Sequence, residues 1–359
     1  MRFFANVMTR PRLLYIFPDL SSFVRKDLSY LESEYEVVKN EFKVPQKALL
    51  PWVMFMQFVS FPFISFRVKK VVAQFGGYHT MIPAFWCAVL NKKLIIVLGG
   101  FDAVALPEIG YGAFANKWMR RAITYSYRKA SIMLPVHESL ILSANNYTKS
   151  SHEGQGVRHF IKDLKTPHIT IFNGYRAEAW QMNASLTKEK TAVTIAVGLH
   201  EERRRILKGV DLILETAPLL PDWTFTIIGD NSQAFLRLVE HIPNIKLFPA
   251  LPQSELEKHL QKSQVYLQLS LSEGFPNALC EAMLCGCIPV VSDVASMPEI
   301  VAETGFILKE KSSRKLSEIL EAIPNNHSVA AQEAARNRIA NKFTESARKE
   351  QFLKAIREI

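Results

Sequence analysis

The sequence has few of the residues that mark a secreted or metal-binding protein. Only four of its 359 residues are cysteine, and three of them, Cys280, Cys285 and Cys287, lie close together. Their number and spacing make no secreted disulfide framework, and no histidines complete a zinc site. We therefore expect buried thiols in a reduced, cytosolic protein. The apolar part of the first segment, MRFFANVMTRPR, is too short for a signal peptide.

Acidic residues are also in the minority, with 34 Asp and Glu against 44 Lys and Arg, a net charge of +10. This balance suits an anionic partner, such as a nucleotide diphosphate, a phospholipid surface or a nucleic acid. No DNA- or RNA-binding motif is present, and the basic residues are scattered over several segments. We therefore expect a nucleotide and an anionic membrane surface as partners, and no nucleic acid.

Strand-like and helix-like segments alternate twice along the chain, and 48% of the residues are apolar, enough for two cores. This pattern predicts an α/β protein with two Rossmann-like, doubly wound domains. The predicted strands of the first domain are Leu13–Phe17, Tyr35–Val38, Val71–Phe75, Leu94–Leu98, Ile132–Leu134 and Ile169–Phe172. Those of the second are Val193–Val197, Phe225–Ile228, Ile245–Phe248, Val265–Leu269, Ile288–Ser292 and Phe306–Leu308.

The boundary between the domains is placed by a turn signal and a polar stretch. Asn173-Gly174 closes the first set of strands, and the polar stretch Asn183–Lys190 is the predicted linker. We assign residues 1–180 to the first domain and 181–342 to the second. The last segment, 343–359, has apolar residues at helical spacing and is expected to return to the first domain.

The most informative stretch is SLSEGFPNALCEAMLCGCIPVVSDVASMPE, residues 270–299. An apolar strand precedes it and a polar turn broken by Gly274 and Pro276 follows. A helix then runs from about Asn277 to Cys285 and stops at Gly286. Such a strand–loop–helix–strand unit binds ligands at the loop. The backbone N–H groups that open the helix, on Asn277, Ala278 and Leu279, are expected to hold a phosphate.

This stretch resembles the donor-site signature of family-4 retaining glycosyltransferases of the GT-B fold. The resemblance rests on EGFPNALCEAM and on the G-x-x-P-V-V and P-E-I-V patterns that follow it. It implies that Glu281 holds the ribose of a sugar nucleotide and that Glu273 holds the sugar ring, with Gly274 and Phe275 in the same donor loop. An ordinary surface loop with two solvated glutamates is the plain alternative.

A second stretch, AVGLHEERRRILKGVD, residues 196–211, resembles the family's diphosphate-binding element. The resemblance implies that Gly198 lies at the donor and that Lys208 neutralises the diphosphate. The family's arginine does not directly follow the glycine here, so we choose Arg203, with Arg204 and Arg205 as rivals. The sequence contains no Asp-x-Asp, the motif that holds a metal in many glycosyltransferases. We therefore expect metal-independent chemistry and no cofactor.

The first domain is expected to supply acceptor-side groups from two glycine-rich strand ends. GGYH contains His79, and GGFD contains Gly100 and Asp102; paired glycines let the backbone approach a ligand closely. Asp102 matches the place where many family members carry a residue near the reacting centre, so we assign it a catalytic role. The family's glycine-rich first loop is missing, and FPDLSSFVRKD stands in its place. In this segment Ser21, Ser22 and Arg25 are the candidates for contact with phosphate or acceptor.

The segment Leu49–Lys70 is unusually apolar, with Trp52, five phenylalanines and no charge before Arg67. Two interpretations stay open: a core helix, or an interfacial helix whose flanking basic residues meet anionic headgroups. The helix predicted at Ala115–Ala130 mixes aromatic and basic residues in the same way and favours membrane contact.

Together these features predict a retaining glycosyltransferase that moves a sugar from a nucleotide sugar to a glycan or lipid-linked acceptor in surface polysaccharide synthesis. It is expected in the cytoplasm, on the inner face of the membrane. The alternatives are a nucleotide-sugar epimerase and a catalytically silent GT-B subunit.

Overall fold

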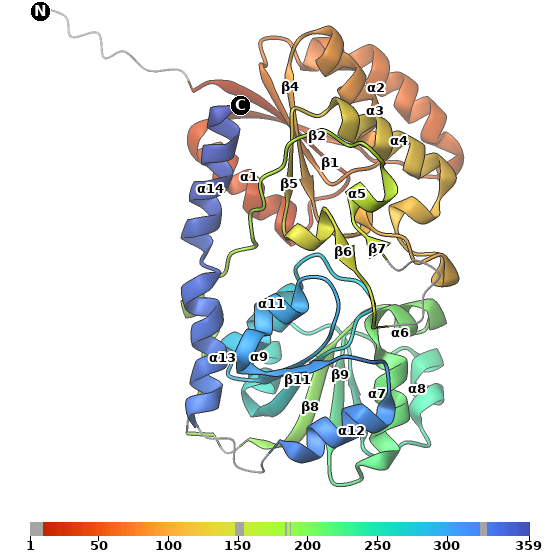
Figure 1. Cartoon of the computed structure of the whole chain (residues 1–359), viewed down its shortest axis with the longest axis vertical. Coiled ribbons are helices and arrows are strands. Elements are labelled where there is room, and N and C mark those ends of the chain that lie inside the picture. Colours follow the sequence, from red (N-terminus) through yellow and green to blue (C-terminus); the bar gives the residue numbers. More distant parts are fainter. Residues whose placement is uncertain (1–9, 148–153, 184, 187, 324–328) are drawn as a thin grey trace, which may run out of the picture.

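The computed structural model describes residues 10–147, 154–183, 185–186, 188–323 and 329–359. Two parallel sheets lie one above the other, each covered by helices, as Figure 1 shows. The predicted pair of doubly wound α/β domains is therefore confirmed. The first sheet has the order β2-β1-β3-β4-β5, formed by β1 (Arg12–Phe17), β2 (Glu36–Glu41), β3 (Lys70–Gln74), β4 (Lys93–Leu98) and β5 (Ile132–Pro135).

Side chains alternate along the strands of the first sheet and build a core on each face. On β1, Leu13 and Tyr15 belong to the core beneath α1, whereas Leu14 and Ile16 belong to the core beneath α3 and α4. This period of two is what a strand buried on both faces requires. One face carries α1 (Ser22–Glu34) and α14 (Glu345–Glu358), and the other carries α2 (Leu50–Ile64), α3 (Tyr78–Val89) and α4 (Lys117–Lys129).

The second sheet has the order β10-β9-β8-β11-β12-β13. Cys280, Cys285 and Cys287 lie in its core, and all four cysteines of the chain are buried and unpaired, as expected. Its strands are β8 (Glu189–Ile195), β9 (Thr224–Ile228), β10 (Ile245–Phe248), β11 (Ser263–Gln268), β12 (Ile288–Ser292) and β13 (Phe306–Leu308). Its helices are α6 (Glu202–Lys208), α7 (Val210–Thr216), α8 (Gln233–Val239), α9 (Gln253–Lys262), α10 (Asn277–Leu284), α11 (Met297–Val301), α12 (Ser313–Ala322) and α13 (Val329–Lys342).

The last two helices run along one side of both domains (Figure 1). α13 packs on α10 of the second domain, and α14 packs on α1 of the first. The contact between α14 and α1 contains a buried ion pair, in which the Arg348 guanidinium donates to both carboxylate oxygens of Asp27 at 2.9 Å. Arg348 also donates to the carbonyls of Ile171 and Phe172, so α14 is fixed to the segment that leaves the first domain.

Two sequence-based assignments need correction. Residues 169–172 form no strand. Their contact with the sheet consists of two hydrogen bonds, from the N–H groups of Ile169 and Ile171 to β5, and the chain then turns at Asn173. The predicted linker, 183–190, overlaps β8, which begins at Glu189. Residues 184 and 187 of the linker and residues 1–9 of the N-terminal segment lie outside the described residues. Short elements complete the description: β6 (Ser143–Ala144), β7 (Gly154–Gln155) and α5 (Val157–Phe160).

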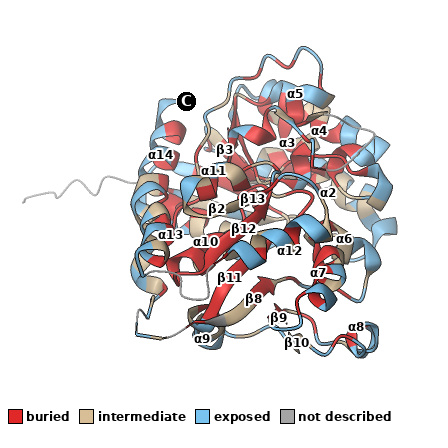
Figure 2. Cartoon of the chain, turned by 60° about the horizontal axis from the view of Figure 1, so that its bottom comes forward, coloured by how far each residue is buried: buried red, intermediate tan, exposed pale blue. Residues whose placement is uncertain are grey.

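The core-helix interpretation of the apolar segment is wrong. Of the fifteen residues of α2, only Gln57 and Phe61 are buried, and Trp52, Phe55 and Phe63 are 60%, 55% and 76% exposed. The span Lys47–Ile64 is long and apolar enough to cross a membrane by length and composition, and only 11% of it is buried. Figure 2 shows the buried strands of both domains beneath helices whose outer faces are exposed.

Candidate active site

The strand order of the second sheet reverses at β8, whose neighbours are β9 and β11. The loops that follow β8 and β11 therefore diverge and leave a crevice at the carboxyl ends of the strands, where open α/β sheets bind ligands. Lys208 ends α6 after β8, and Glu273 lies on the loop after β11. Their side chains meet in this crevice, with Lys208 Nζ 2.6 Å from Glu273 Oε1. The fold thus brings the predicted diphosphate and sugar residues together.

The carboxylate of Glu273 is fixed in one orientation. Gln268 Nε2 donates to its Oε1 at 3.1 Å, and Ser270 Oγ donates to the same oxygen at 2.8 Å. Lys208 supplies a third donor to this oxygen. A carboxylate held in this way needs no reorganisation when a ligand binds, which is what positions a reacting sugar accurately.

The backbones of the two domains touch beside Glu273. A Cβ on Gly274 would lie 1.8 Å from the carbonyl oxygen of Gly99, and a Cβ on Gly100 would lie 3.1 Å from the backbone nitrogen of Gly274. Gly100 also has a φ of +142°, which side chains rarely permit. Glycine at these positions therefore allows the GGFD turn of the first domain to lie against the donor loop of the second.

Asp102 lies on the GGFD turn, beside the donor loop, and the structure shows what its carboxylate contacts. Its side chain is buried, and its two oxygens accept bonds from the N–H groups of Gly76, Gly99 and Gly100 and from the hydroxyl of Tyr127, at 2.8 to 3.1 Å. With four donors around it, this carboxylate is already engaged by the protein. We therefore assign Asp102 to positioning the two glycine turns, not to contact with the sugar.

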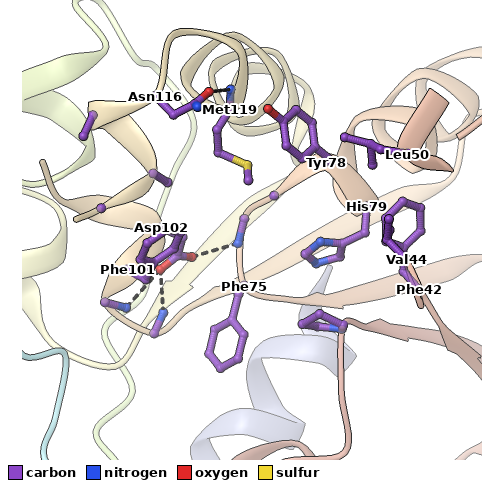
Figure 3. Close-up of a pocket in the computed structure, with 18 of the residues that line it drawn as sticks. Phe42, Val44, Leu50, Phe75, Tyr78, His79, Phe101, Asp102, Asn116 and Met119 are labelled. Carbon is purple, nitrogen blue, oxygen red and sulfur yellow. Dashed lines mark hydrogen bonds between the residues drawn. The ribbon is translucent and has the colours of Figure 1, made fainter. Parts of the chain in front are cut away.

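A cavity of about 1100 Å³ opens in the first domain above these turns. Figure 3 shows its lining, with Met119 and Asn116 of the α4 region on one side and Leu50 of α2 on the other. His79 also lines it; its Nε2 lies 3.0 Å from the carbonyl oxygen of Gln74, and burial lowers its pKa, which favours the neutral ring. Most of the remaining lining is glycine or apolar side chain, including Phe42, Val44, Phe75 and Phe101.

Among the three candidate arginines, the geometry favours Arg204. Arg203 is exposed and its Nε is 2.5 Å from Glu201 Oε2, whereas Arg205 donates to the carbonyls of Leu199 and His200. The side chain of Arg204 lies beside Gly198, whose φ is +73°. We therefore prefer Arg204 to Arg203 as the expected phosphate contact, because Arg204 lies beside the predicted phosphate-binding turn and, among the described residues, has no carboxylate at hydrogen-bond distance.

Glu281 lines a second cavity, of about 180 Å³, between the two domains. Burial raises the pKa of Glu281 to about 7, and the nearby Lys26 ammonium acts in the opposite direction. Asn277, at the first turn of α10, lines the same cavity and accepts a bond of 2.7 Å from the hydroxyl of Tyr175. A half-buried carboxyl beside a helix N-terminus suits a ligand that offers both hydroxyls and phosphate.

The other predicted donor residues divide into two groups. Asn277 and Ala278 are partly exposed, whereas Leu279 is fully buried. Phe275 is buried among the rings of Phe172, Tyr175 and Phe343. The side chains of Phe275 and Leu279 therefore belong to the core.

Sequence reasoning missed Lys26 and Tyr175. Lys26 lines the cavity of Glu281, with its ammonium 5.6 Å from the centre of the Tyr175 ring and bonded to the carbonyl of Gly174. Ser22 lines the cavity as well, whereas Arg25, weighed from the sequence, is exposed and donates to the Leu20 carbonyl. Ser22 and Lys26 are one helical turn apart and so lie on the same face of α1. This spacing is the signal in the sequence that would have indicated Lys26 instead of Arg25.

The two stacked α/β domains and the crevice define a two-domain protein of the GT-B class. Residues 180–347 match the family model described as glycosyl transferases group 1. The match covers the second domain and the start of α14, and it confirms the resemblance stated from EGFPNALCEAM.

Curated relatives match at modest identity. The chain is 28% identical over 143 residues to an uncharacterized 41.2 kDa protein in the cps region of Klebsiella pneumoniae, covering 39% of this chain and only 40% of that one. It is 24% identical to the N-acetyl-alpha-D-glucosaminyl L-malate synthase of Bacillus anthracis, over 64% of this chain and 59% of that enzyme. The match to the amylovoran biosynthesis glycosyltransferase AmsK of Erwinia amylovora is longer, with 26% identity over 317 residues, 78% of this chain and 74% of that protein.

Solved structures share the whole fold. Sucrose-phosphate synthase from Thermosynechococcus elongatus superposes with a TM-score of 0.73 at 12% identity, covering 97% of this chain and 99% of that one. Anabaena Alr3699/HepE in complex with UDP-glucose gives a TM-score of 0.69 at 13% identity, covering 97% and 100%. These neighbours establish the GT-B fold across both domains.

Proposed function

We propose that the protein is a retaining, metal-independent glycosyltransferase that moves a sugar from a nucleotide diphosphate sugar to a glycan or lipid-linked acceptor in surface polysaccharide synthesis. The observation that carries the proposal is the contact of Lys208 with Glu273 in the crevice, just before α10 begins. The group 1 family match supports it, as do the names of the Erwinia and Klebsiella relatives.

In the proposed reaction, the bond between the sugar and the diphosphate breaks, and the diphosphate leaves with the electron pair. The acceptor oxygen forms the new bond on the same face of the sugar, and its proton passes to the departing diphosphate. Lys208, Arg204 and the N–H groups that open α10 stabilise the charge that develops on the leaving group. Glu273 accepts bonds from the sugar and Glu281 accepts bonds from the ribose, while the cavity beside His79 and Gly100 holds the acceptor.

We also propose that the protein works on the cytoplasmic face of a membrane and binds it through α2. The support is the exposed apolar face of α2, which includes Trp52, Phe55 and Phe63. A helix of this kind lies in the interface between headgroups and acyl chains. The net charge of +10 adds attraction to anionic lipid.

Replacing both Trp52 and Phe55 with serine tests the α2 contact. Because both side chains are exposed, the variant should keep the wild-type melting temperature. Its vesicle affinity should fall by about thirty- to a thousandfold, since each residue loses roughly 1–2 kcal/mol of apolar burial in the interface. Co-sedimentation with anionic liposomes measures the change. A folded variant that sediments as the wild type does would remove α2 from the membrane contact.

The experiment that tests the function is a panel of sugar nucleotides with different bases, in the presence and absence of EDTA. At least one should raise the melting temperature and be hydrolysed slowly, with equal rates in both buffers. Binding without any turnover would favour a silent GT-B subunit, and isomerisation of the donor sugar would favour an epimerase. Activity that EDTA abolishes and Mg²⁺ or Mn²⁺ restores would overturn the metal-free mechanism.

Glu281 predicts a pH dependence of donor binding. With a pKa of about 7 in the free protein, the carboxyl is mostly protonated at pH 6 and mostly ionised at pH 8. Ribose hydroxyls bind the ionised form better, so affinity should rise about tenfold between these values. UDP-glucose is a suitable probe, because its diphosphate has no group that titrates in this range. Calorimetry should show the rise in the wild type and a flat, weaker profile in Glu281→Gln; a profile shared by both proteins would contradict the ribose assignment.

A further inference from the structure

α4 carries a stripe of basic residues on the side that faces away from the sheet. Its inner side chains, among them Ala122, Ile123, Ser126 and Tyr127, are buried against the domain. Its outer side lines a groove of about 490 Å³. The lining residues recur at helical spacing. They are Thr124, Tyr125 and five cations, Lys117, Arg120, Arg121, Arg128 and Lys129.

No carboxylate belongs to this lining, and none of the ion pairs found in the described part of the chain uses its five cations. Arg120 and Arg128 each donate one bond to a backbone carbonyl, of Phe160 and Lys162, which fixes their position. Arg121 lies over the ring of Trp118, 5.0 Å from its centre, and that ring is 66% exposed. Within the described part of the chain, the groove therefore gathers five cations that form no ion pair, next to an exposed aromatic ring.

The groove shares its face of the domain with the apolar surface of α2. α3 packs against both α2 and α4, so the three helices lie side by side on one face of the first sheet, as Figure 1 shows. Phe85, Val89 and Leu90 continue the exposed apolar surface across α3. Apolar and aromatic residues next to a basic stripe match a bilayer surface, where acyl chains lie beneath anionic headgroups.

We propose that the groove on α4 binds the phosphate of anionic phospholipid headgroups while α2 lies in the interface beside it. This site rests on the proposed membrane association and adds a specific contact to it. Leu50 begins α2 and Asn116 caps α4, and both line the large cavity of the first domain. Docking through both helices therefore turns the mouth of the acceptor cavity toward the bilayer, from which an acceptor anchored in lipid would enter.

The test compares two variants that each lose two positive charges. Arg121→Gln with Lys129→Gln removes groove cations that, within the described part of the chain, donate to no backbone carbonyl, and Arg237→Gln with Lys246→Gln removes exposed cations of the second domain. Binding is measured by co-sedimentation with vesicles of phosphatidylcholine alone and of phosphatidylcholine and phosphatidylglycerol in a three-to-one ratio. Melting temperature and UDP-glucose affinity serve as checks of folding.

Each basic residue near an anionic surface contributes about fivefold to affinity. The groove variant should therefore bind the mixed vesicles about 25-fold more weakly than the wild type, and the control variant about as well as the wild type. Equal losses in the two variants would show a diffuse charge effect and overturn the groove site. So would a groove variant that keeps wild-type binding. If no sugar nucleotide binds but the groove variant still loses vesicle affinity, the proposed function fails and the lipid site stands.

Discussion

Replacing Lys208 with alanine should lower the turnover number about a hundred- to a thousandfold. The ammonium lies in the crevice where the diphosphate is expected, and a fixed donor at a developing negative charge typically contributes this much. It is also only partly exposed, at 28%, so water cannot easily replace it. The rate of sugar transfer or donor hydrolysis measures the loss, and Lys208→Arg, which keeps the charge, should recover part of it.

Lys311→Ala is the matched control for this prediction. Lys311 forms a similar part-buried ion pair with Asp211 in the same domain, with 2.5 Å between Nζ and Oδ2. Its loss removes one cation and leaves one carboxylate unpaired, as the loss of Lys208 does, but the ammonium that is removed pairs with Asp211 at the start of α7 and not with Glu273. Turnover that falls equally in both variants would mean that Lys208 acts through the stability of the domain and not at the diphosphate.

Asp102→Ala should destabilise the first domain by about 3–5 kcal/mol. The substitution leaves three backbone N–H groups without this acceptor in a buried place, and the Tyr127 hydroxyl keeps only the backbone carbonyl of residue 102. Tyr127→Phe removes one of the four donors and should cost only about 1–2 kcal/mol. Urea unfolding followed by tryptophan fluorescence measures both changes.

The same variants separate a positioning role from a catalytic one. If Asp102 positions the glycine turns, the loss of turnover should follow the loss of stability, so Tyr127→Phe should lower turnover less than Asp102→Ala does. The affinity for UDP-glucose should change little in either variant. A stable Asp102→Ala protein with wild-type unfolding and no turnover would instead return Asp102 to direct contact with the sugar.

The second domain could be predicted closely because its signals are local. The apolar run before Ser270, the breakers Gly274 and Pro276, and the helix stop at Gly286 each act within a few residues, and β11, α10 and β12 form where expected. Gly286 has a φ of +76°, as a helix-ending glycine requires. The strand predicted at 169–172 failed because an apolar, β-branched run shows that a segment can extend, not that a neighbour is free to pair along its length.

The sequence by itself determined the class of protein, since residue types at fixed spacing within one strand–loop–helix unit specify a phosphate-binding turn and two glutamates. Only the tertiary structure decided what those residues face. It surrounded Asp102 with four donors, paired Arg203 with Glu201 while Arg204 lies beside Gly198, and placed Lys26 of the first domain at the cavity of Glu281. It also left α2 uncovered, which no pattern along that helix could show. The physical reason is the same in each case: burial, pairing and pKa depend on groups that are far away in the chain and are brought near only by packing.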